Sequence, residues 1–367
     1  MRKELIPFRL PSDPAGMSLP FDLFNNNGVL VLQRGSRLDD PTRIGRLAEM
    51  RLYRMDTAPE GTSPTPPEQL NALAEAYAAA TAADAGVAPK VLIGIADELH
   101  GLIMDHPDMC LGMMRHLQSV SNTRRQALFS ATLGCLVTIS MGLPLGAQKT
   151  LIRAALSMNL STFALQDALN REARLPTAEE CEILWRHPWQ SADLLYRAGV
   201  TDTDWLTAVR LHHENLDRSG YPYRIGLKGL TLEARILRVV DVFAAMIGQR
   251  QNRNAYTPRQ AMRLAFERER GHLDDAVMLT LRRVIGKNPP GTLVKLANRE
   301  TAVITHWFKH VETPKFVVSL LWPSGDPMQQ PRARNPRAYG QNIREYTTLP
   351  FAAPPLNWSK IWAQALP

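Results

Sequence analysis

The stretch LHHENLDRSGYPYRIGLKG, residues 211–229, gathers side chains that could bind a metal ion or a phosphate. The candidate groups are His212, His213, Glu214 and Asp217, followed by the turn Gly220-Tyr221-Pro222. Imidazole suits borderline divalent ions and carboxylate suits hard ones. Adjacent helical residues point about 100° apart, so the two histidines are expected to serve two neighbouring ions, or one ion and the substrate.

Two further positions could complete such a site. Pro188 suits the first turn of a helix, which would place His187 at the start of that helix. Asp241 falls inside the apolar stripe of a helix, where a carboxylate is costly unless something compensates it. Its compensation is either a ligand role or an ion pair with Arg238.

The elements that must position these residues are mainly helical. We expect a small β-rich module over 1–57, where Asn27-Gly28 predicts a tight hairpin, and a Pro-rich linker over 58–68. Apolar residues at helical spacing predict a helical domain over 69–288. After Pro289 the period changes, which predicts a β extension over 289–327 and an irregular tail over 328–367.

Composition limits the class of protein. The chain has 367 residues, 45% hydrophobic and 21% charged, as is ordinary for a globular protein. The sequence has no apolar run long enough for a membrane span and no signal-peptide core, so we expect a cytoplasmic protein. Its three cysteines lack CxxC spacing, which argues against a thiolate zinc site.

The charge balance points to an anionic partner. The formal net charge is +8, which favours either an anion site or a generally basic surface. The basic residues are spread along the chain and no helix-turn-helix or zinc-finger pattern occurs, so duplex nucleic acid is not an expected partner.

The order of these motifs, HP…HHENLDRSGYP…ARILRVVDVFAAM…RQNR, resembles the HD-GYP branch of the HD phosphohydrolase superfamily over about residues 90–290. The family consists of helical bacterial proteins that hydrolyse cyclic di-GMP with two or three metal ions. By this resemblance His187, His212, His213 and Asp241 are metal ligands, and Arg250 and Arg253 contact the nucleotide, unless the two arginines only cap the end of a helix. Tyr221 and Lys228 are further candidates for contact with the nucleotide. The family's Gly-Tyr-Pro surface is associated with diguanylate cyclase (GGDEF) domains, which makes such a domain a candidate partner.

The chain departs from the family upstream of these motifs. Where the family has its His-Asp pair and a lysine, AALSMNLS places Ser157, Met158 and Ser161. The first family histidine is expected at Asn122, and Arg218 stands where glycine is usual.

These departures predict an incomplete metal site. A paired-metal centre needs a bridging carboxylate, and a thioether is a poor ligand for hard or borderline ions. The surviving set would hold one divalent ion, iron or manganese, or none. The leading hypothesis is a degenerate member that binds cyclic di-GMP or a protein partner with little or no hydrolysis. The alternatives are an active phosphodiesterase with a remodelled site and a scaffold that binds neither metal nor nucleotide.

Overall fold

The structure is a computed structural model, and it divides into two compact units, residues 1–65 and residues 66–367. The described residues are 4–8, 23–25, 29–33, 36–50, 52–56, 64–82, 86–248, 255–305, 317–338, 340–348 and 357–363.

The N-terminal unit contains the expected β structure. Its strands are β1 (Glu4–Phe8), β2 (Leu23–Phe24), β3 (Leu30–Leu32) and β4 (Leu52–Asp56), with one helix, α1 (Pro41–Glu49). The strands form an antiparallel sheet in the order β1-β4-β2-β3. The pairing of β2 with β3 agrees with a hairpin, whereas the expected turn at Asn27-Gly28 lies outside the described residues.

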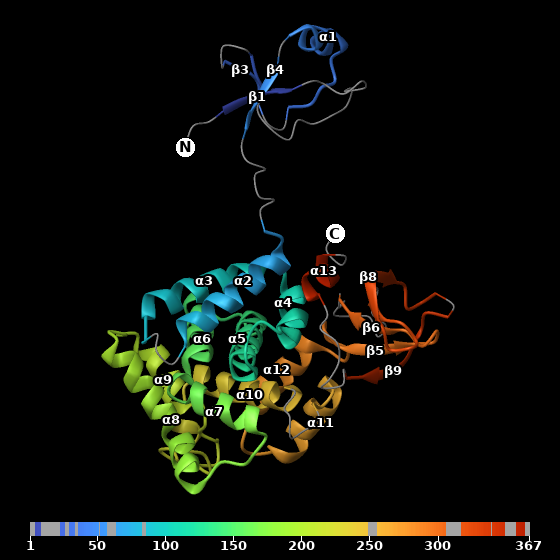
Figure 1. The fold of residues 1–367 in the computed structure, drawn as a ribbon. Helices are drawn as coiled ribbons and strands as arrows, with labels where there is room; N and C mark the ends of the chain where they lie inside the picture. Colours follow the sequence, from blue (N-terminus) through green and yellow to red (C-terminus); the bar gives the residue numbers. More distant parts are fainter. Residues whose placement is uncertain are drawn as a thin grey trace. The chain divides into compact units, whose positions relative to one another are not determined.

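The second unit is mainly helical, as expected (Figure 1). Its helices are α2 (Pro66–Ala80), α3 (Pro89–Asp105), α4 (Pro107–Met113), η1 (Met114–His116), α5 (Asn122–Ser140), α6 (Leu145–Ser157), η2 (Leu160–Thr162), α7 (Phe163–Glu172), α8 (Ala178–Arg197), α9 (Thr203–Leu211), η3 (Leu227–Gly229), α10 (Leu232–Ile247), α11 (Pro258–Arg268) and α12 (Asp275–Ile285). One apolar core joins most of them, and α5 contributes buried residues along most of its length. None of the helices in the described residues is long and apolar enough to cross a membrane.

Three capped helices position the candidate ligands: α8 and α10 contain His187 and Asp241, and α9 ends just before His212. Thr177 begins α8 with a capping box to Glu180, and the Asp202 side chain accepts the backbone N–H of Trp205 at the start of α9. Thr231 caps α10 in the same way. Each cap satisfies backbone donors that the helix itself leaves unpaired, so the sequence fixes where these helices begin.

Two local expectations are wrong. Pro188 lies inside α8 rather than in its first turn, so His187 sits in the middle of a continuous helix. α9 ends at Leu211, which places His212 at the C-cap and His213 beyond the helix. The 100° divergence expected for adjacent helical residues therefore does not apply to this pair.

The C-terminal tail is not irregular, contrary to expectation. β5 (Leu293–Leu296), β6 (Thr301–Ile304) and β7 (Val317–Leu321) are joined by β8 (Pro327–Arg334) and β9 (Ile343–Thr347) in an antiparallel sheet of order β8-β7-β6-β5-β9. The polar sequences of β8 and β9 form the two edges of this sheet, where side chains stay exposed and apolar periodicity is weak.

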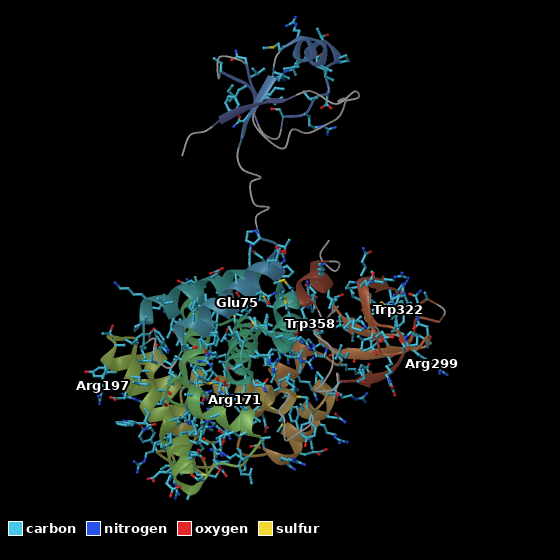
Figure 2. All side chains as sticks on the ribbon, viewed as in Figure 1. Glu75, Arg171, Arg197, Arg299, Trp322 and Trp358 are labelled. Carbon is cyan, nitrogen blue, oxygen red and sulfur yellow. The ribbon has the colours of Figure 1, made fainter. Side chains whose placement is uncertain are left out.

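A last helix, α13 (Trp358–Ala363), packs near α2 and α4 (Figure 1). Trp358 of α13 stacks on His116 with ring centroids 4.1 Å apart (Figure 2). The tail is thus attached to the helical core.

Candidate functional site

Three histidines from separate sequence motifs converge in the structure. His187 of α8 and the consecutive His212 and His213 each place one ring nitrogen within 4.8 Å of the others. His187 and His212 are buried and His213 is half-buried. Nitrogens bound at about 2.1 Å to one tetrahedral ion lie about 3.4 Å apart, so ring movements of up to about 1.4 Å would bring all three around one ion.

The backbone fixes the orientation of two of these rings. His187 Nδ1 contacts the carbonyl oxygen of Leu184, and His212 Nδ1 contacts that of Val209 at 2.7 Å. A carbonyl only accepts, so both Nδ1 atoms carry the proton in the neutral rings and both Nε2 atoms present lone pairs. These two Nε2 atoms lie 3.1 Å apart. A cation between two facing lone pairs would stabilise this arrangement, and carbonyl-anchored histidines are typical metal ligands.

Burial keeps the histidine cluster (His187, His212 and His213) neutral. Desolvation lowers the pKa of His187 to about 3 and that of His212 to about 4. It also lowers the pKa of His213 well below its ordinary value, with smaller contributions from the neighbouring histidines and Arg238. Neutral imidazole is the form that binds a metal ion, so the donor set fits a divalent ion.

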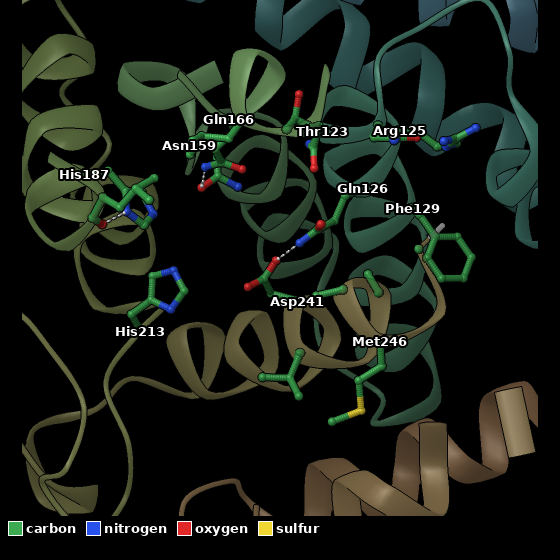
Figure 3. A pocket seen from close by; sticks show the side chains of 18 of the residues that line it. Thr123, Arg125, Gln126, Phe129, Asn159, Gln166, His187, His213, Asp241 and Met246 are labelled. Atoms are coloured by element: carbon green, nitrogen blue, oxygen red, sulfur yellow. Dashed lines mark hydrogen bonds between the residues drawn. The ribbon is translucent and has the colours of Figure 1, made fainter. Parts of the chain in front are cut away.

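Asp241 of α10 is compensated by an amide. Gln126 Nε2 of α5 donates a hydrogen bond of 2.8 Å to Asp241 Oδ1 (Figure 3). Arg238 instead donates to Asn215 Oδ1 at 3.1 Å and lies 3.4 Å from His213 Nδ1. The described contacts thus include no ion pair between Asp241 and Arg238, which was one of the two expected compensations.

The residues expected to replace the His-Asp pair lie away from the cavity. Ser157 Oγ accepts a hydrogen bond from Trp205 Nε1 at 2.8 Å and donates to the Arg153 carbonyl. Met158 is fully buried in the core. The next residue, Asn159, lines the cavity instead, close to His187 in Figure 3. The sequence prediction is therefore displaced by one residue at this point.

Ser161 also lies outside the lining. Its Oγ is 3.0 Å from Ser191 Oγ and 3.4 Å from the carbonyl oxygen of His187, so it ties η2 to α8. Asn122 does line the cavity, as expected for a site residue, and Gln126 lies one helical turn further along α5. The period of the helix could have identified Gln126, because residues four apart share a face.

A cavity of about 580 Å³ adjoins the histidine cluster (Figure 3). Of the expected site residues, His187, His213, Tyr221, Asp241 and Asn122 line it. His212 is fully buried behind this wall, and Lys228 is exposed on η3 and does not line the cavity. Arg250 and Arg253 lie outside the described residues. The volume falls in the ordinary range for a small-molecule site.

Glu214 organises the loop that follows the histidines. Its carboxylate accepts the backbone N–H groups of Tyr223, Arg224 and Ile225 at 2.6–3.0 Å. The bond between Tyr221 and Pro222 is cis. This motif glutamate therefore shapes the loop.

The glycine of the Gly-Tyr-Pro turn is required by close packing. A Cβ on Gly220 would lie less than 3.0 Å from backbone atoms of His213, Glu214 and Asn215. Asp217 accepts hydrogen bonds from the backbone and hydroxyl of Ser219, so it too serves the turn. Arg218 has a φ of 71°, a conformation that glycine adopts without strain, which explains the usual glycine there.

An aromatic stack leads from the surface to the histidines. Tyr221 stacks on His213 with centroids 4.6 Å apart, and Trp185 stacks on Tyr221 at 5.9 Å. Burial raises the pKa of the Tyr221 phenol, so this group stays neutral. The motif tyrosine thus supports a candidate ligand and also faces the cavity.

Comparison with known proteins gives consistent matches. A family model for the HD domain matches residues 100–277. The chain is 26% identical over 215 residues to the cyclic di-GMP phosphodiesterase PA4108 of Pseudomonas aeruginosa, a match that covers 57% of this chain and 50% of that protein. It is 31% identical over 142 residues to the cyclic di-GMP phosphodiesterase response regulator RpfG of Xanthomonas campestris pv. campestris, covering 38% of this chain and 37% of that protein.

Among solved structures, the HDG"Y"P protein Bd1817 from Bdellovibrio bacteriovorus aligns with a TM-score of 0.49 at 14% identity, covering 77% of this chain and 99% of that chain. The chain spans half or less of the length of the two curated relatives above. The region matched by the HD model contains the histidine cluster, Tyr221 and Asp241. Residues 100–277 thus match an HD domain, and the relatives that align with the chain are cyclic di-GMP phosphodiesterases, which supports an HD-GYP-like domain here.

Proposed function

We propose that the chain binds cyclic di-GMP, or a closely related cyclic dinucleotide, as part of bacterial cyclic di-GMP signalling, and hydrolyses it little or not at all. The ligand class rests on the phosphodiesterase relatives and on a cavity of suitable size beside the histidine cluster.

The observation that carries the low-turnover proposal is the hydrogen bond from Gln126 Nε2 to Asp241 Oδ1. A paired-metal hydrolase holds its ions about 3.5–4 Å apart, usually with a bridging carboxylate. Here the wall beside Asp241 carries the neutral amides of Asn122, Gln126 and Asn159. Amide oxygens are weaker ligands than carboxylates, and the Gln126 N–H group already occupies one Asp241 oxygen.

One divalent ion, iron or manganese, is part of the proposal. His187, His212 and His213 would hold it, and Asp241 would lie beyond them across the cavity. Such an ion would supply a positive charge for a phosphate oxygen of the ligand. Tyr221 and the aromatic stack would keep His213 in place.

Calorimetry with cyclic di-GMP tests binding directly. The wild-type chain is expected to bind, and Arg250→Ala and Arg253→Ala are expected to weaken binding at least tenfold if these arginines contact phosphate or guanine. Arg270→Ala, an exposed residue, is the matched control. If calorimetry shows no binding of cyclic di-GMP to the manganese-loaded wild type, the proposal is contradicted, and the chain is better described as a scaffold that binds no nucleotide.

A second candidate is a phosphodiesterase that works with one ion. The facing Nε2 atoms of His187 and His212 favour it, because this geometry suits a bound ion. Hydrolysis by the iron- or manganese-loaded chain that His212→Ala abolishes would establish this candidate in place of the first.

A diguanylate cyclase domain is the proposed protein partner. The loop after the cis peptide exposes Tyr223 and Leu227 beside the cavity-lining Tyr221. Exposed aromatic and aliphatic side chains are typical anchors of protein interfaces. Binding to a purified GGDEF domain that Tyr223→Ser lowers at least tenfold would support this partner, and unchanged binding would exclude this surface.

A further inference from the structure

Two arginines line the cavity away from the histidine cluster. Arg115 belongs to η1 and Arg125 to α5, and both side chains reach the cavity wall. The Nε and Nη1 atoms of Arg115 are buried and have no hydrogen-bond partner in the described part of the chain. Arg125 uses one nitrogen to donate to the Leu117 carbonyl at 2.9 Å.

These two positive charges lack a carboxylate partner among the described ion pairs. The acids of the cavity wall are engaged elsewhere: Asp241 accepts from Gln126, and Glu269 faces His272 at 3.4 Å. A buried cation without a counter-ion costs free energy that a bound anion would return. The wall thus carries uncompensated positive charge.

Both arginines are half-buried, so their guanidinium groups are partly desolvated. Burial lowers the pKa of Arg115 to about 10 and lowers that of Arg125. Both positive charges also lower the pKa of the buried His116. The two arginines therefore act on one small region of the fold.

The segment that carries Arg115 is held firmly. His116 Nε2 bonds to the Gly291 carbonyl at 2.7 Å, and its ring is stacked against Trp358. The neighbouring Gly112 packs so closely on Gly291 and Trp362 that a side chain would not fit. A guanidinium on such a support is preorganised and loses little further entropy on binding.

The arginine end and the histidine end of the cavity are separated. The cavity follows α10 from Asp241 to Gly248, which at 1.5 Å per residue is about 10 Å. In Figure 3, Arg125 lies on the far side of Asp241 from His187 and His213. A ligand that reached both ends would need two anionic groups.

We propose that Arg115 and Arg125 form a phosphate-binding subsite at the end of the cavity opposite the histidine cluster. The subsite takes one phosphodiester of a cyclic dinucleotide while the other faces the histidines. The identity of this ligand rests on the proposed function, whereas the affinity for phosphate rests on the two arginines alone. Bidentate contact with a guanidinium is the recognition that phosphate favours.

The test measures cyclic di-GMP affinity and thermal unfolding of the full chain for the wild type, Arg115→Met and Arg125→Met. Methionine keeps much of the apolar stem and removes the charge. Each variant is expected to bind cyclic di-GMP at least tenfold more weakly. The control Arg197→Met, on an exposed surface of α8, is expected to bind within twofold of the wild type.

The unfolding temperature without ligand tells whether Arg115 serves ligand recognition or the stability of the fold. Because Arg115 is half-buried and its buried Nε and Nη1 atoms have no hydrogen-bond partner among the described residues, Arg115→Met is expected to unfold at the wild-type temperature or higher. A lower unfolding temperature, or failure to fold, would assign Arg115 a structural role and overturn the proposal. Wild-type-like cyclic di-GMP affinity in both Arg115→Met and Arg125→Met would overturn it as well.

Inorganic phosphate distinguishes this inference from the proposed function. If the wild type does not bind cyclic di-GMP, the proposed function fails, yet phosphate is still expected to raise the unfolding temperature of the wild type and of Arg197→Met. The increase is expected to disappear in Arg115→Met. An equal increase in all variants would show general salt stabilisation and overturn the subsite.

Discussion

The histidine cluster and the amide wall (Asn122, Gln126 and Asn159) present different polar chemistry to the same cavity. In the cluster, backbone carbonyls orient the rings of His187 and His212, so that their Nε2 atoms face each other 3.1 Å apart. On the amide wall, Gln126 satisfies Asp241 within the protein. The first arrangement suits a bound ion, whereas the second is satisfied by a contact within the protein.

This difference shows that the residues that keep the backbone of the site in shape are not those that a paired-metal reaction requires. Glu214 and Gly220 maintain the backbone around the histidines, and this role persists whatever ion is bound. Catalysis by paired ions makes a stricter demand, because it needs anionic ligands on the opposite wall. The motif that is easiest to recognise therefore says more about the shape of the site than about its turnover.

The largest expected effect is on the amount of bound metal, which should depend on the histidine cluster and not on the amide wall. His212→Ala is expected to lower bound manganese or iron at least tenfold, since it removes a buried ligand and leaves His187 without its neighbour. Gln126→Ala is expected to leave metal content near the wild-type value. Metal analysis of chelator-free preparations measures both, with His100→Ala, a residue bonded to Gln148, as control. Equal loss of metal in His212→Ala and Gln126→Ala would contradict the proposal that only the histidine cluster binds the ion.

A second comparison concerns stability. Gly220→Ala is expected to destabilise the chain by about 1–3 kcal/mol or more, because the added Cβ would overlap neighbouring backbone atoms. Gly146→Ala provides a control on α6, where nothing lies near the added atom. Urea unfolding measures the difference. A Gly220→Ala variant as stable as Gly146→Ala would mean that the loop relaxes freely.

Loss of the amide contact should have a moderate effect. Gln126→Ala leaves the buried carboxylate of Asp241 without its hydrogen bond, and we expect a loss of about 1–3 kcal/mol in the free energy of unfolding. The double variant Gln126→Ala/Asp241→Asn is expected to recover part of this loss. If the single variant is as stable as the wild type, Gln126 does not compensate Asp241.

The histidine cluster also predicts a dependence of stability on pH. Folding lowers the pKa of His187 to about 3 and of His212 to about 4, so the unfolded chain binds more protons below its ordinary histidine pKa of about 6.5. The free energy of unfolding of metal-free protein should thus fall as pH decreases from about 6.5 towards 4. Urea titrations at several pH values check this, and His212→Gln should show a shallower fall. Equal slopes for the two proteins would contradict the burial argument.

The smallest expected effect concerns Lys228. The sequence predicts a ligand contact, but the side chain is exposed on η3 and away from the cavity lining. Lys228→Ala is therefore expected to change cyclic di-GMP affinity less than twofold in calorimetry. A tenfold loss would mean that the η3 loop closes over the ligand.

Sequence patterns predicted the helical domain and the flanking β segments well, because apolar periodicity and capping residues are local signals. They failed at β8 and β9, whose edge positions leave polar side chains exposed. They also misplaced His187 within its helix, since a proline that fits a helix start is tolerated here inside α8.

The sequence predicted those site residues that belong to a motif of several residues. It missed site residues that stand alone in the sequence. The sequence comparison placed the replaced pair at Ser157 and Met158, whereas the adjacent Asn159 lines the cavity, because a sequence motif does not tell which of two neighbouring residues faces a cavity. Gln126 and Arg115 gave no motif signal. Their roles arise from contacts across the fold, to Asp241 in one case and to the cavity in the other.

The most direct test of the account is a joint measurement of metal content and cyclic di-GMP turnover on one preparation of the full chain. The account predicts at most one bound ion per chain, bound nucleotide, and no hydrolysis above that of His212→Ala. Two or more ions together with hydrolysis that disappears in His212→Ala would contradict it.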